Sequence, residues 1–290
     1  MPLLTVKDIE RLIPAFKGKA GNAAAEILRK ILSIETLSSI YDDLSDQQGA
    51  DFAGGVLKEV HTDYRIGNPE RLDMLPDGPF ITISNHPYGG LDGIILIDLF
   101  GHIRDGYKYM VNEFLNLVEN LRPCLIVVNP KTEMSDSKIT VNNIHGVREA
   151  LQRIHDGFPV GFFPSGAVSD LSLKEMKIRD REWQPSVLRL IQKARVPIVP
   201  VRFFDHNSFW FYNLGLISWK VRVLQLPHEL VNKRHRRIRI GIGETISVEE
   251  QSPYKDIKEY GRFLREKVYG MPLPEHFLKY SKYIAQGRKI

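Results

Sequence analysis

Short apolar runs alternate along this chain with longer segments whose apolar residues recur every three or four positions. Runs of the first kind are typical of buried strands, and segments of the second kind are typical of helices. Strands are predicted at residues 80–85, 109–112, 124–128, 160–163 and 196–204, and helices at residues 93–100, 113–121, 141–155, 183–194 and 255–269. Because wholly apolar strands that alternate with helices indicate a sheet covered on both faces, we predict an α/β fold, with a mostly parallel mixed sheet flanked by helices.

The N-terminal part of the chain lacks this alternation. Helical spacing of apolar residues predicts helices at residues 6–16 and 49–58 and two short helices within residues 22–44. We expect residues 1–58 to form an N-terminal helical extension that packs on the core or lies on a membrane surface, and residues 59–290 to form the main domain. Period-two alternation predicts further strands at residues 60–66, 219–226 and 238–242.

Polar residues follow three of the predicted strands at their carboxyl ends. Asn85 and His86 follow the first of these strands, residues 129–131 follow the second, and residues 164–166 follow the third. The carboxyl ends of parallel strands lie along one edge of a sheet, where α/β proteins bind their ligands. We therefore expect these residues to surround one cleft.

His86 and Asp92 stand at the two ends of a short turn that contains Gly89 and Gly90. Imidazole titrates near neutrality and takes a proton from a hydroxyl when a carboxylate holds its ring in one tautomer. The two residues meet only if the turn folds back, and the paired glycines supply the backbone freedom for that. A structural interpretation is equally concrete: Asp92 caps the following helix, and backbone groups satisfy His86.

The composition permits a full hydrophobic core. Of the 290 residues 43% are apolar, which suits one large domain or a domain with an added subdomain. The single cysteine, Cys124, lies in an apolar run, so we interpret it as a core residue of a protein from a reducing compartment. The sequence contains no apolar run of about 20 residues and no signal-peptide pattern, and we expect a protein that is soluble or lies on a membrane surface.

Basic residues are concentrated in the larger part of the chain. Residues 1–80 contain nine Lys and Arg against thirteen Asp and Glu, whereas residues 81–290 contain 31 against 22. This excess favours an anionic partner, which on charge alone includes phosphate-bearing lipid, an acyl-carrier protein, a nucleotide-containing thioester and nucleic acid. The densest basic run, residues 233–237, leads into a predicted strand without any nucleic-acid motif, so no nucleic acid is expected.

Three motifs follow one another in the larger part of the chain: residues 85–93 (NHPYGGLDG), residues 163–166 (FPSG) and residues 196–201 (VPIVPV). In this order they resemble the catalytic His/Asp motif, the acceptor-binding motif and the V-P-x-x-P-V motif of the lysophospholipid (glycerolphosphate acyltransferase-like) acyltransferase superfamily. The chain is most similar to its hemolysin-like branch, which is associated with ornithine and glycine lipids. Five residues instead of the usual four separate His86 from Asp92, and Ser165 stands where Glu is commoner.

The resemblance implies an enzyme that transfers a fatty acyl group from an acyl thioester to a hydroxyl of a lyso-lipid or related precursor, with no cofactor and no metal. His86 would act as general base, and Asp92 would orient its ring. The donor would be an acyl-carrier protein thioester or acyl-CoA. The protein would lie in the cytoplasm against the anionic inner face of the cell membrane. The substrate-binding residues would be Gly89, Gly90, Lys131, Pro164, Ser165, Gly166, Arg202, Asn207 and Ser208.

Four cations near predicted strand ends suit a phosphate or carboxylate of the acceptor: Lys131, Arg179, Arg181 and Arg202. Ordinary surface placement explains each of them equally well. Asn207 and Ser208 likewise suit either polar contacts with the substrate or the stabilisation of a turn.

Two other classes of protein remain open on the residues alone. One is a metal-dependent hydrolase that uses His86, Asp92 and a further histidine such as His61 or His145, although no metal-binding spacing accompanies them. The other is a basic, non-enzymatic protein that binds an anionic membrane or nucleic acid through residues 233–239.

Overall fold

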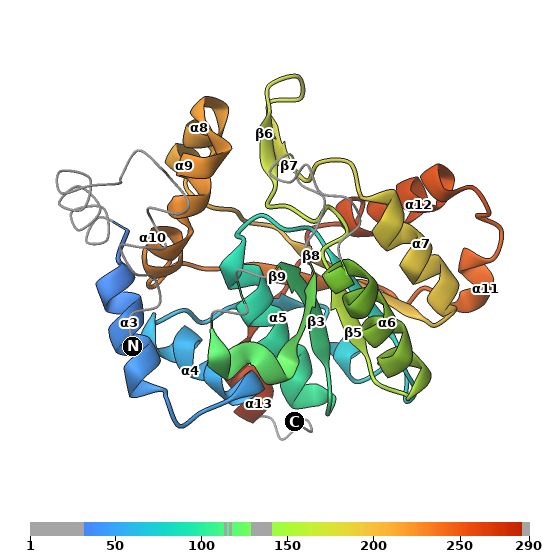
Figure 1. The fold of residues 1–290 in the computed structure, drawn as a ribbon, viewed down its shortest axis with the longest axis horizontal. Helices are drawn as coiled ribbons and strands as arrows, with labels where there is room; N and C mark the ends of the chain where they lie inside the picture. The colour runs from blue at the N-terminus through green and yellow to red at the C-terminus, as the bar shows by residue number, and fades with distance from the viewer. Residues whose placement is uncertain (1–31, 113–114, 116–117, 129–140, 286–290) are drawn as a thin grey trace.

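A sheet of eight strands runs through the computed structural model, which describes residues 32–112, 115, 118–128 and 141–285 (Figure 1). The strand order is β10-β1-β9-β8-β2-β5-β3-β4, and a separate hairpin, β6-β7, projects from the body. The strands are β1 (Arg65–Gly67), β2 (Ile81–Ser84), β3 (Lys108–Asn112), β4 (Leu125–Val128), β5 (Val160–Phe162), β6 (Asp170–Ser172), β7 (Lys177–Arg179), β8 (Ile198–Phe203), β9 (Arg239–Ile242) and β10 (Phe277–Lys279).

Five neighbouring strands of the sheet run in the same direction. β2 pairs in parallel with β5 and β8, and β3 pairs in parallel with β4 and β5. β9 is antiparallel to β8, and β1 is parallel to β9 and antiparallel to β10. The sheet is therefore mixed and mostly parallel, as predicted, and the carboxyl ends of β2, β5 and β8 lie along one edge.

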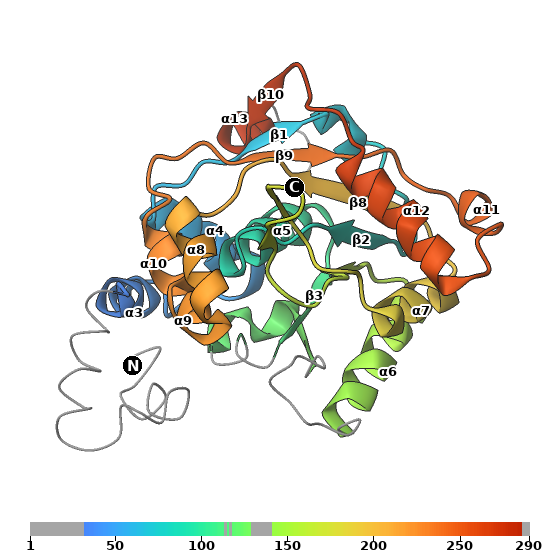
Figure 2. The same cartoon turned by 90° about the horizontal axis from the view of Figure 1, so that it is seen from above.

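Helices cover both faces of the sheet. One apolar cluster joins α4 and α5 to the sheet, and a second joins α6, α7 and α12 to it (Figure 2). On β8, Val199 and Val201 enter the first cluster and Ile198 enters the second, because alternate residues of a strand point to opposite faces. The helices are α3 (Ile34–Asp43), α4 (Gly49–Glu59), α5 (Gly90–Ile103), α6 (Val141–His155), α7 (Pro185–Ala194), α8 (Phe209–Ile217), α9 (Trp219–Leu224), α10 (Leu226–Val231), α11 (Val248–Gln251), α12 (Ile257–Tyr269) and α13 (Tyr280–Ala285), with 3-10 helices η2 (Pro69–Leu72) and η4 (Glu119–Cys124).

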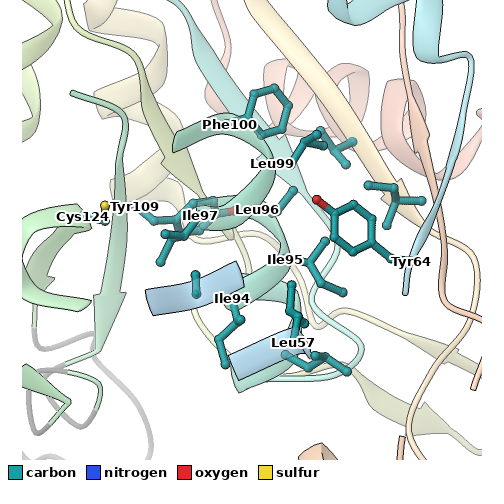
Figure 3. Close-up of a cluster of buried hydrophobic side chains, with 14 of the residues drawn as sticks. Leu57, Tyr64, Ile94, Ile95, Leu96, Ile97, Leu99, Phe100, Tyr109 and Cys124 are labelled. Carbon is teal, nitrogen blue, oxygen red and sulfur yellow. The ribbon is translucent and has the colours of Figure 1, made fainter. Parts of the chain in front are cut away.

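Helix α5 lies within the first apolar cluster and carries Asp92. Every residue from Leu91 to Phe100 is buried, because this segment is apolar on all sides of the helix apart from two aspartates. Figure 3 shows the α5 side chains surrounded by residues of other elements, among them Leu57 of α4 and Tyr109 of β3. Packing on all sides fixes the first turn of α5 and the loop that precedes it.

Most of the predicted elements are confirmed to within a few residues. Strands β2, β3, β5 and β8 lie where the apolar runs predicted them, β9 lies where period-two alternation predicted it, and α6 has the predicted bounds. The helix predicted at residues 93–100 is longer, since α5 begins at Gly90 and ends at Ile103. Cys124 is buried, as expected, although it ends η4 and β4 begins one residue later.

The strand predicted at residues 60–66 is wrong over most of its length, because β1 comprises Arg65–Gly67 only. The end of α4 continues into this segment, where the amide of Thr62 donates to the carbonyl of Leu57. His61 has a φ of 51°, a left-handed conformation that ends helices and does not continue a strand. Alternate residues from Thr62 to Ile66 are nevertheless buried, so period-two burial begins three residues before the paired strand β1.

The strand predicted at residues 219–226 is also wrong, because the segment forms α9 and the start of α10. The sheet has no position for it, since β8 pairs directly with β9. Over so short a segment the alternation of apolar and basic side chains is compatible with both periods, and packing decides between them.

Of the helix predicted at residues 113–121, residues 113–114 and 116–117 lie outside the described part of the chain. The described end forms the 3-10 helix η4, which contains Pro123. Proline removes a backbone donor and disfavours a continuous α-helix there, so the predicted α-helix is wrong for this end.

The N-terminal extension is described only from residue 32. The helix predicted at residues 6–16 and the first of the two within residues 22–44 lie outside the described part, whereas α3 confirms the second. α4 packs on α5 in the main core, and a domain boundary at residue 58 stays a prediction. Among the described helices, none has the length and hydropathy needed to cross a bilayer.

A second His-Asp cluster lies away from the loop between β2 and α5. His102 contacts two carboxylates, Asp98 and, at 3.1 Å, Asp51. Asp98 is buried and also accepts a hydrogen bond from Tyr64. The two carboxylates raise the pKa of His102 to about 9, although burial opposes them. Because folding raises this pKa, the contribution to stability is complete below the unfolded value of about 6.5 and is lost as the pH rises to about 9.

Between pH 6.5 and 9 we therefore expect the free energy of unfolding to fall more in the unsubstituted protein than in the His102→Gln variant. After allowance for solvent screening, the difference between the two decreases should be roughly 1–2 kcal/mol. Urea unfolding at several pH values measures this difference. Parallel pH profiles for the two proteins would contradict the assignment.

Candidate active site

Asn85 fastens the loop between β2 and α5 to the neighbouring strand. Its Oδ1 accepts a hydrogen bond from the amide of Phe203 at 2.8 Å, and its Nδ2 donates to the carbonyl of the same residue at 2.9 Å. The buried amide thus continues the pairing of β2 with β8 one residue beyond the end of β2. This contact fixes the point at which the chain leaves the sheet, immediately before His86.

His86, in the loop that Asn85 fastens, meets Asp92 in the first turn of α5. Nδ1 of His86 lies 3.0 Å from Oδ2 of Asp92, and the same oxygen accepts a hydrogen bond from the amide of Tyr88 at 3.0 Å. The Asp92 side chain is fully buried, whereas that of His86 is 15% exposed. When Asp92 is ionised it can only accept, so Nδ1 of His86 then donates the proton and Nε2 keeps a lone pair. The five intervening residues therefore do not prevent the pairing.

The environment of Asp92 does not favour its charged form. Burial raises the pKa of this carboxyl above its ordinary value, while His86 and the amide of Tyr88 act in the opposite direction. Its second oxygen, Oδ1, is buried and has no hydrogen-bond partner in the described part of the chain. A buried and partly unsatisfied carboxylate costs stability, and such groups are typical of functional sites.

The FPSG motif lies beside the histidine. The ring of Phe163 stacks on the imidazole of His86 with centroids 3.8 Å apart. The next residues form a tight turn in which Gly166 has a φ of 65° and donates to the carbonyl of Phe163. The Ser165 hydroxyl is buried and donates to the carbonyl of Ala167, so it stabilises its own turn. Pro164 is buried in the same turn and accepts a hydrogen bond through its carbonyl.

Asp180 holds the backbone of His86 from the opposite side. Its Oδ1 accepts hydrogen bonds from the amide of His86 at 3.1 Å and from the Ser169 hydroxyl at 2.6 Å, and its Oδ2 accepts from the indole of Trp183. The amide of Ser169 in turn donates to the carbonyl of His86. Residues on either side of the β6-β7 hairpin therefore bind both the amide and the carbonyl of His86.

Asn207 and Ser208 connect the same loop to α8. The buried Asn207 donates from Nδ2 to the carbonyl of Tyr88 at 3.1 Å. Ser208 caps the N-terminus of α8 and donates its hydroxyl to Glu229, a buried carboxylate that also pairs with Lys233. Although burial opposes it, pairing with Lys233 and Ser208 lowers the pKa of Glu229. Asn207 thus holds the loop directly, and Ser208 connects the start of α8 to Glu229 of α10.

The three described cations of the predicted set, Arg179, Arg181 and Arg202, contact groups other than His86. Arg202 donates to the carbonyls of Tyr269 and Met271 at the end of α12. Arg179 and Arg181 pair with acidic residues of their own hairpin segment, at Glu175 and Asp170. Lys131 lies outside the described residues, so its role stays a prediction. The hydrogen bonds of Arg202 fasten the end of α12, and its role in substrate binding stays a prediction.

Gly89 and Gly90 differ in what a side chain would meet. Gly89 has a φ of 78° and ψ of −112°, and a Cβ there would lie 2.7 Å from a methyl of Leu226. A Cβ at Gly90 would have no neighbour within 4 Å. The first glycine is therefore required by the turn, and the second leaves open space beside it.

We expect Gly89→Ala to lower the free energy of unfolding by about 1–3 kcal/mol, because alanine is strained in this conformation and contacts Leu226. Gly90→Ala is expected to change it by less than about 1 kcal/mol. Urea unfolding of the two variants tests the contrast. Equal midpoints would show that the φ of Gly89 does not restrain the turn.

The described residues contain no group of three or more His, Cys, Asp or Glu side chains placed to hold a metal ion. His61 stacks on His235, and His145 lies exposed on α6. Neither the stacking of His61 nor the exposed position of His145 supports the alternative of a metal site shared with His86.

Sequence comparison decides the family. A family model described as an acyltransferase matches residues 10–276. The chain belongs to this acyltransferase family. The predicted resemblance and the prediction of an enzyme are thereby confirmed, and the alternative of a non-enzymatic binding protein is wrong.

Two relatives of this acyltransferase carry the same description. A lyso-glycine lipid O-acyltransferase from Phocaeicola vulgatus is 26% identical over 278 residues, which cover 90% of this chain and 94% of the relative. A lyso-glycine lipid O-acyltransferase from Bacteroides thetaiotaomicron is 26% identical over 249 residues, covering 83% and 87% of the two chains. Both relatives match along most of their length, so the similarity is not confined to the three motifs.

Three contacts of this site were not predicted from the sequence: the stacking of Phe163, the hydrogen bonds of Asp180 and the contact of Glu229 with Ser208. Arg179 and Arg181, which flank Asp180 in the sequence, were predicted as ligands of the acceptor because of their charge. No local signal distinguishes Asp180, since its contact with His86 depends on how the hairpin segment folds back.

Proposed function

We propose that this acyltransferase moves a fatty acyl group from an acyl thioester to the hydroxyl of a lyso-lipid, and that the acceptor is a lyso-glycine lipid or a close analogue. The contact between His86 and Asp92 carries the proposal, because it supplies an oriented general base at the carboxyl edge of the sheet. The names of the two relatives support the choice of acceptor.

In the proposed mechanism, Nε2 of His86 removes the proton from the acceptor hydroxyl as its oxygen attacks the thioester carbonyl. The carbon–sulfur bond then breaks, and the imidazolium returns the proton to the departing thiolate. The products are an ester and a free thiol. Asp92 keeps the imidazole oriented and stabilises its positive charge. Because the thioester is already activated, base, orientation and oxyanion binding suffice.

We assign oxyanion binding to the backbone amides at the start of α5. The amide of Tyr88 is occupied by Asp92, and the amide of Gly166 is occupied by the carbonyl of Phe163. The first amides of a helix have no partner within the helix, and the helix N-terminus favours negative charge. The open space beside Gly90 gives a thioester room to approach these amides.

The finer aspects of the proposal concern the donor and the place of the reaction. The basic excess of the chain suits both anionic donors, an acyl-carrier protein thioester and acyl-CoA. Ser165 puts a neutral side chain where the commoner motif has Glu, which reduces repulsion of an acceptor that carries a carboxylate. We propose that the protein acts in the cytoplasm at the inner face of the membrane, where a lyso-lipid acceptor resides.

The direct test combines the purified protein, an acyl thioester and separate lyso-lipid acceptors. Release of the thiol measures turnover, and mass spectrometry of the lipid product shows where the acyl group is attached. We expect an ester at the hydroxyl of lyso-glycine lipid and slower reaction with lysophosphatidic acid. Thiol release that no lyso-lipid accelerates would overturn the proposal.

A further inference from the structure

Helix α8 has apolar side chains on both its buried and its exposed sides. Phe211 and Tyr212 are buried in the body of the protein. On the other side Trp210 is 64% exposed and Ile217 is 81% exposed. Seven positions separate Trp210 from Ile217, and seven also separate Phe209 from Leu216, so these four residues share one side of the helix. We call Phe209, Trp210, Leu216, Ile217 and the exposed Val221 of α9 the apolar face.

The tip of the β6-β7 hairpin is a second exposed apolar site. Leu173 is 62% exposed and Met176 is 73% exposed, in the turn between the two strands. Figure 1 shows the hairpin and α8 and α9 projecting on the same side of the molecule, opposite α13. Exposed apolar groups of this size on projecting elements are typical of contact with a membrane or another protein.

The charges around these groups favour an anionic lipid surface. Between Asp205 and Glu229 the sequence contains no carboxylate. At the hairpin tip two exposed lysines, at residues 174 and 177, flank one exposed carboxylate, Glu175, which pairs with Arg179. Exposed aromatic and aliphatic side chains beside a local excess of cations suit the boundary between anionic headgroups and acyl chains.

The apolar face is joined directly to the loop of His86. Tyr212, on the buried side of α8, donates a hydrogen bond to the carbonyl of Pro87 at 2.7 Å. Arg222 of α9 is buried and pairs with Asp170 at the base of the hairpin. The two projecting elements are thus joined to each other, and both begin at the carboxyl edge of the sheet.

We propose that the apolar face and the hairpin tip dock together on an anionic bilayer surface and so hold the His86 loop over the lipid. This inference rests on the proposed function for its purpose, because a lyso-lipid acceptor is presented at such a surface. The docking itself is a property of exposed side chains and does not require turnover.

The test is the sedimentation of the full chain with vesicles of phosphatidylcholine alone or mixed with phosphatidylglycerol. We expect stronger binding to the anionic vesicles, and binding about tenfold weaker for the double variant Trp210→Ser, Ile217→Ser. The matched control, Met74→Ser, Leu273→Ser, removes two other exposed apolar side chains and is expected to bind within about twofold of the unsubstituted protein.

Equal binding by the double variant and the unsubstituted protein would overturn the proposal, as would failure of the unsubstituted protein to bind. Sedimentation velocity without vesicles gives another outcome: a dimer that the double variant abolishes would make a second copy of the chain the occupant and would also overturn it. Turnover with an acceptor dissolved below its aggregation concentration should be unchanged in the double variant. If that turnover is missing from the unsubstituted protein as well, the proposed function fails while vesicle binding still decides the docking.

Discussion

Replacing His86 with asparagine is expected to lower the rate of acyl transfer by about 10²–10⁴, because the variant has no base at the position of Nε2. The asparagine amide retains a donor near the position of Nδ1, so Asp92 is not left without its partner. The variant should therefore fold, as circular dichroism and urea unfolding will show. Turnover at the normal rate by a folded His86→Asn protein would exclude this residue as the base.

Asp92→Asn is expected to separate activity from stability. An amide does not stabilise the imidazolium, and the rate should again fall by about 10²–10⁴. Because burial raises the pKa of Asp92, its contribution to stability is present below the ordinary pKa and is lost as the pH rises through the folded value. Near neutrality the neutral amide should therefore lower the free energy of unfolding by no more than about 1 kcal/mol.

Asp98→Asn is the matched control for Asp92→Asn, since both residues are buried on α5. Asp98 is paired with Tyr64 and His102, and its replacement should destabilise the fold by about 1–3 kcal/mol while leaving turnover per folded molecule unchanged. The opposite pattern, with Asp92→Asn unstable and active, would show that Asp92 serves the fold and not the reaction.

The parallel part of the fold was predictable because its strands are wholly apolar and alternate with helices. β2, β5 and β8 were found for this reason, and their shared direction correctly predicted that Asn85, His86 and the FPSG turn lie at one edge. The residues 60–66 and 219–226 misled the prediction, since short alternating segments carry little information on period and their partners decide their structure. β6, β7 and β10 comprise three residues each and gave no pattern to find.

In the site, the contact of His86 with Asp92 was predictable and its supports were not. His86 follows β2 and Asp92 lies in the first turn of α5, only six positions later, so the spacing and the two glycines contained the necessary information. Residues such as Asn207 and Arg202 were correctly noticed as polar groups near strand ends, but their hydrogen bonds go to the backbone of distant segments. A sequence does not show which of several polar residues faces the cleft and which faces the protein.

Asp180→Ala is expected to remove the acceptor of three buried donors: the amide of His86, the hydroxyl of Ser169 and the indole of Trp183. Loss of these bonds should lower the free energy of unfolding by about 3 kcal/mol. The rate of acyl transfer should fall by about 10², because a displaced His86 no longer meets the reacting groups in the required geometry. Since Asp180 acts through His86, the loss should appear in kcat, with little change in KM for the thioester.

A matched pair of variants distinguishes positioning from general destabilisation. Asp180→Asn retains one acceptor oxygen for His86 and Ser169 but turns an amide donor toward Trp183. Replacing Trp183 with phenylalanine removes that donor conflict, so the double variant should recover kcat relative to Asp180→Asn despite the further loss of core packing. If kcat instead follows stability across all of these variants, Asp180 serves only the fold. Recovery of kcat without recovery of stability would establish that this carboxylate, held at its backbone by Tyr269 and Arg265 of α12, positions the histidine.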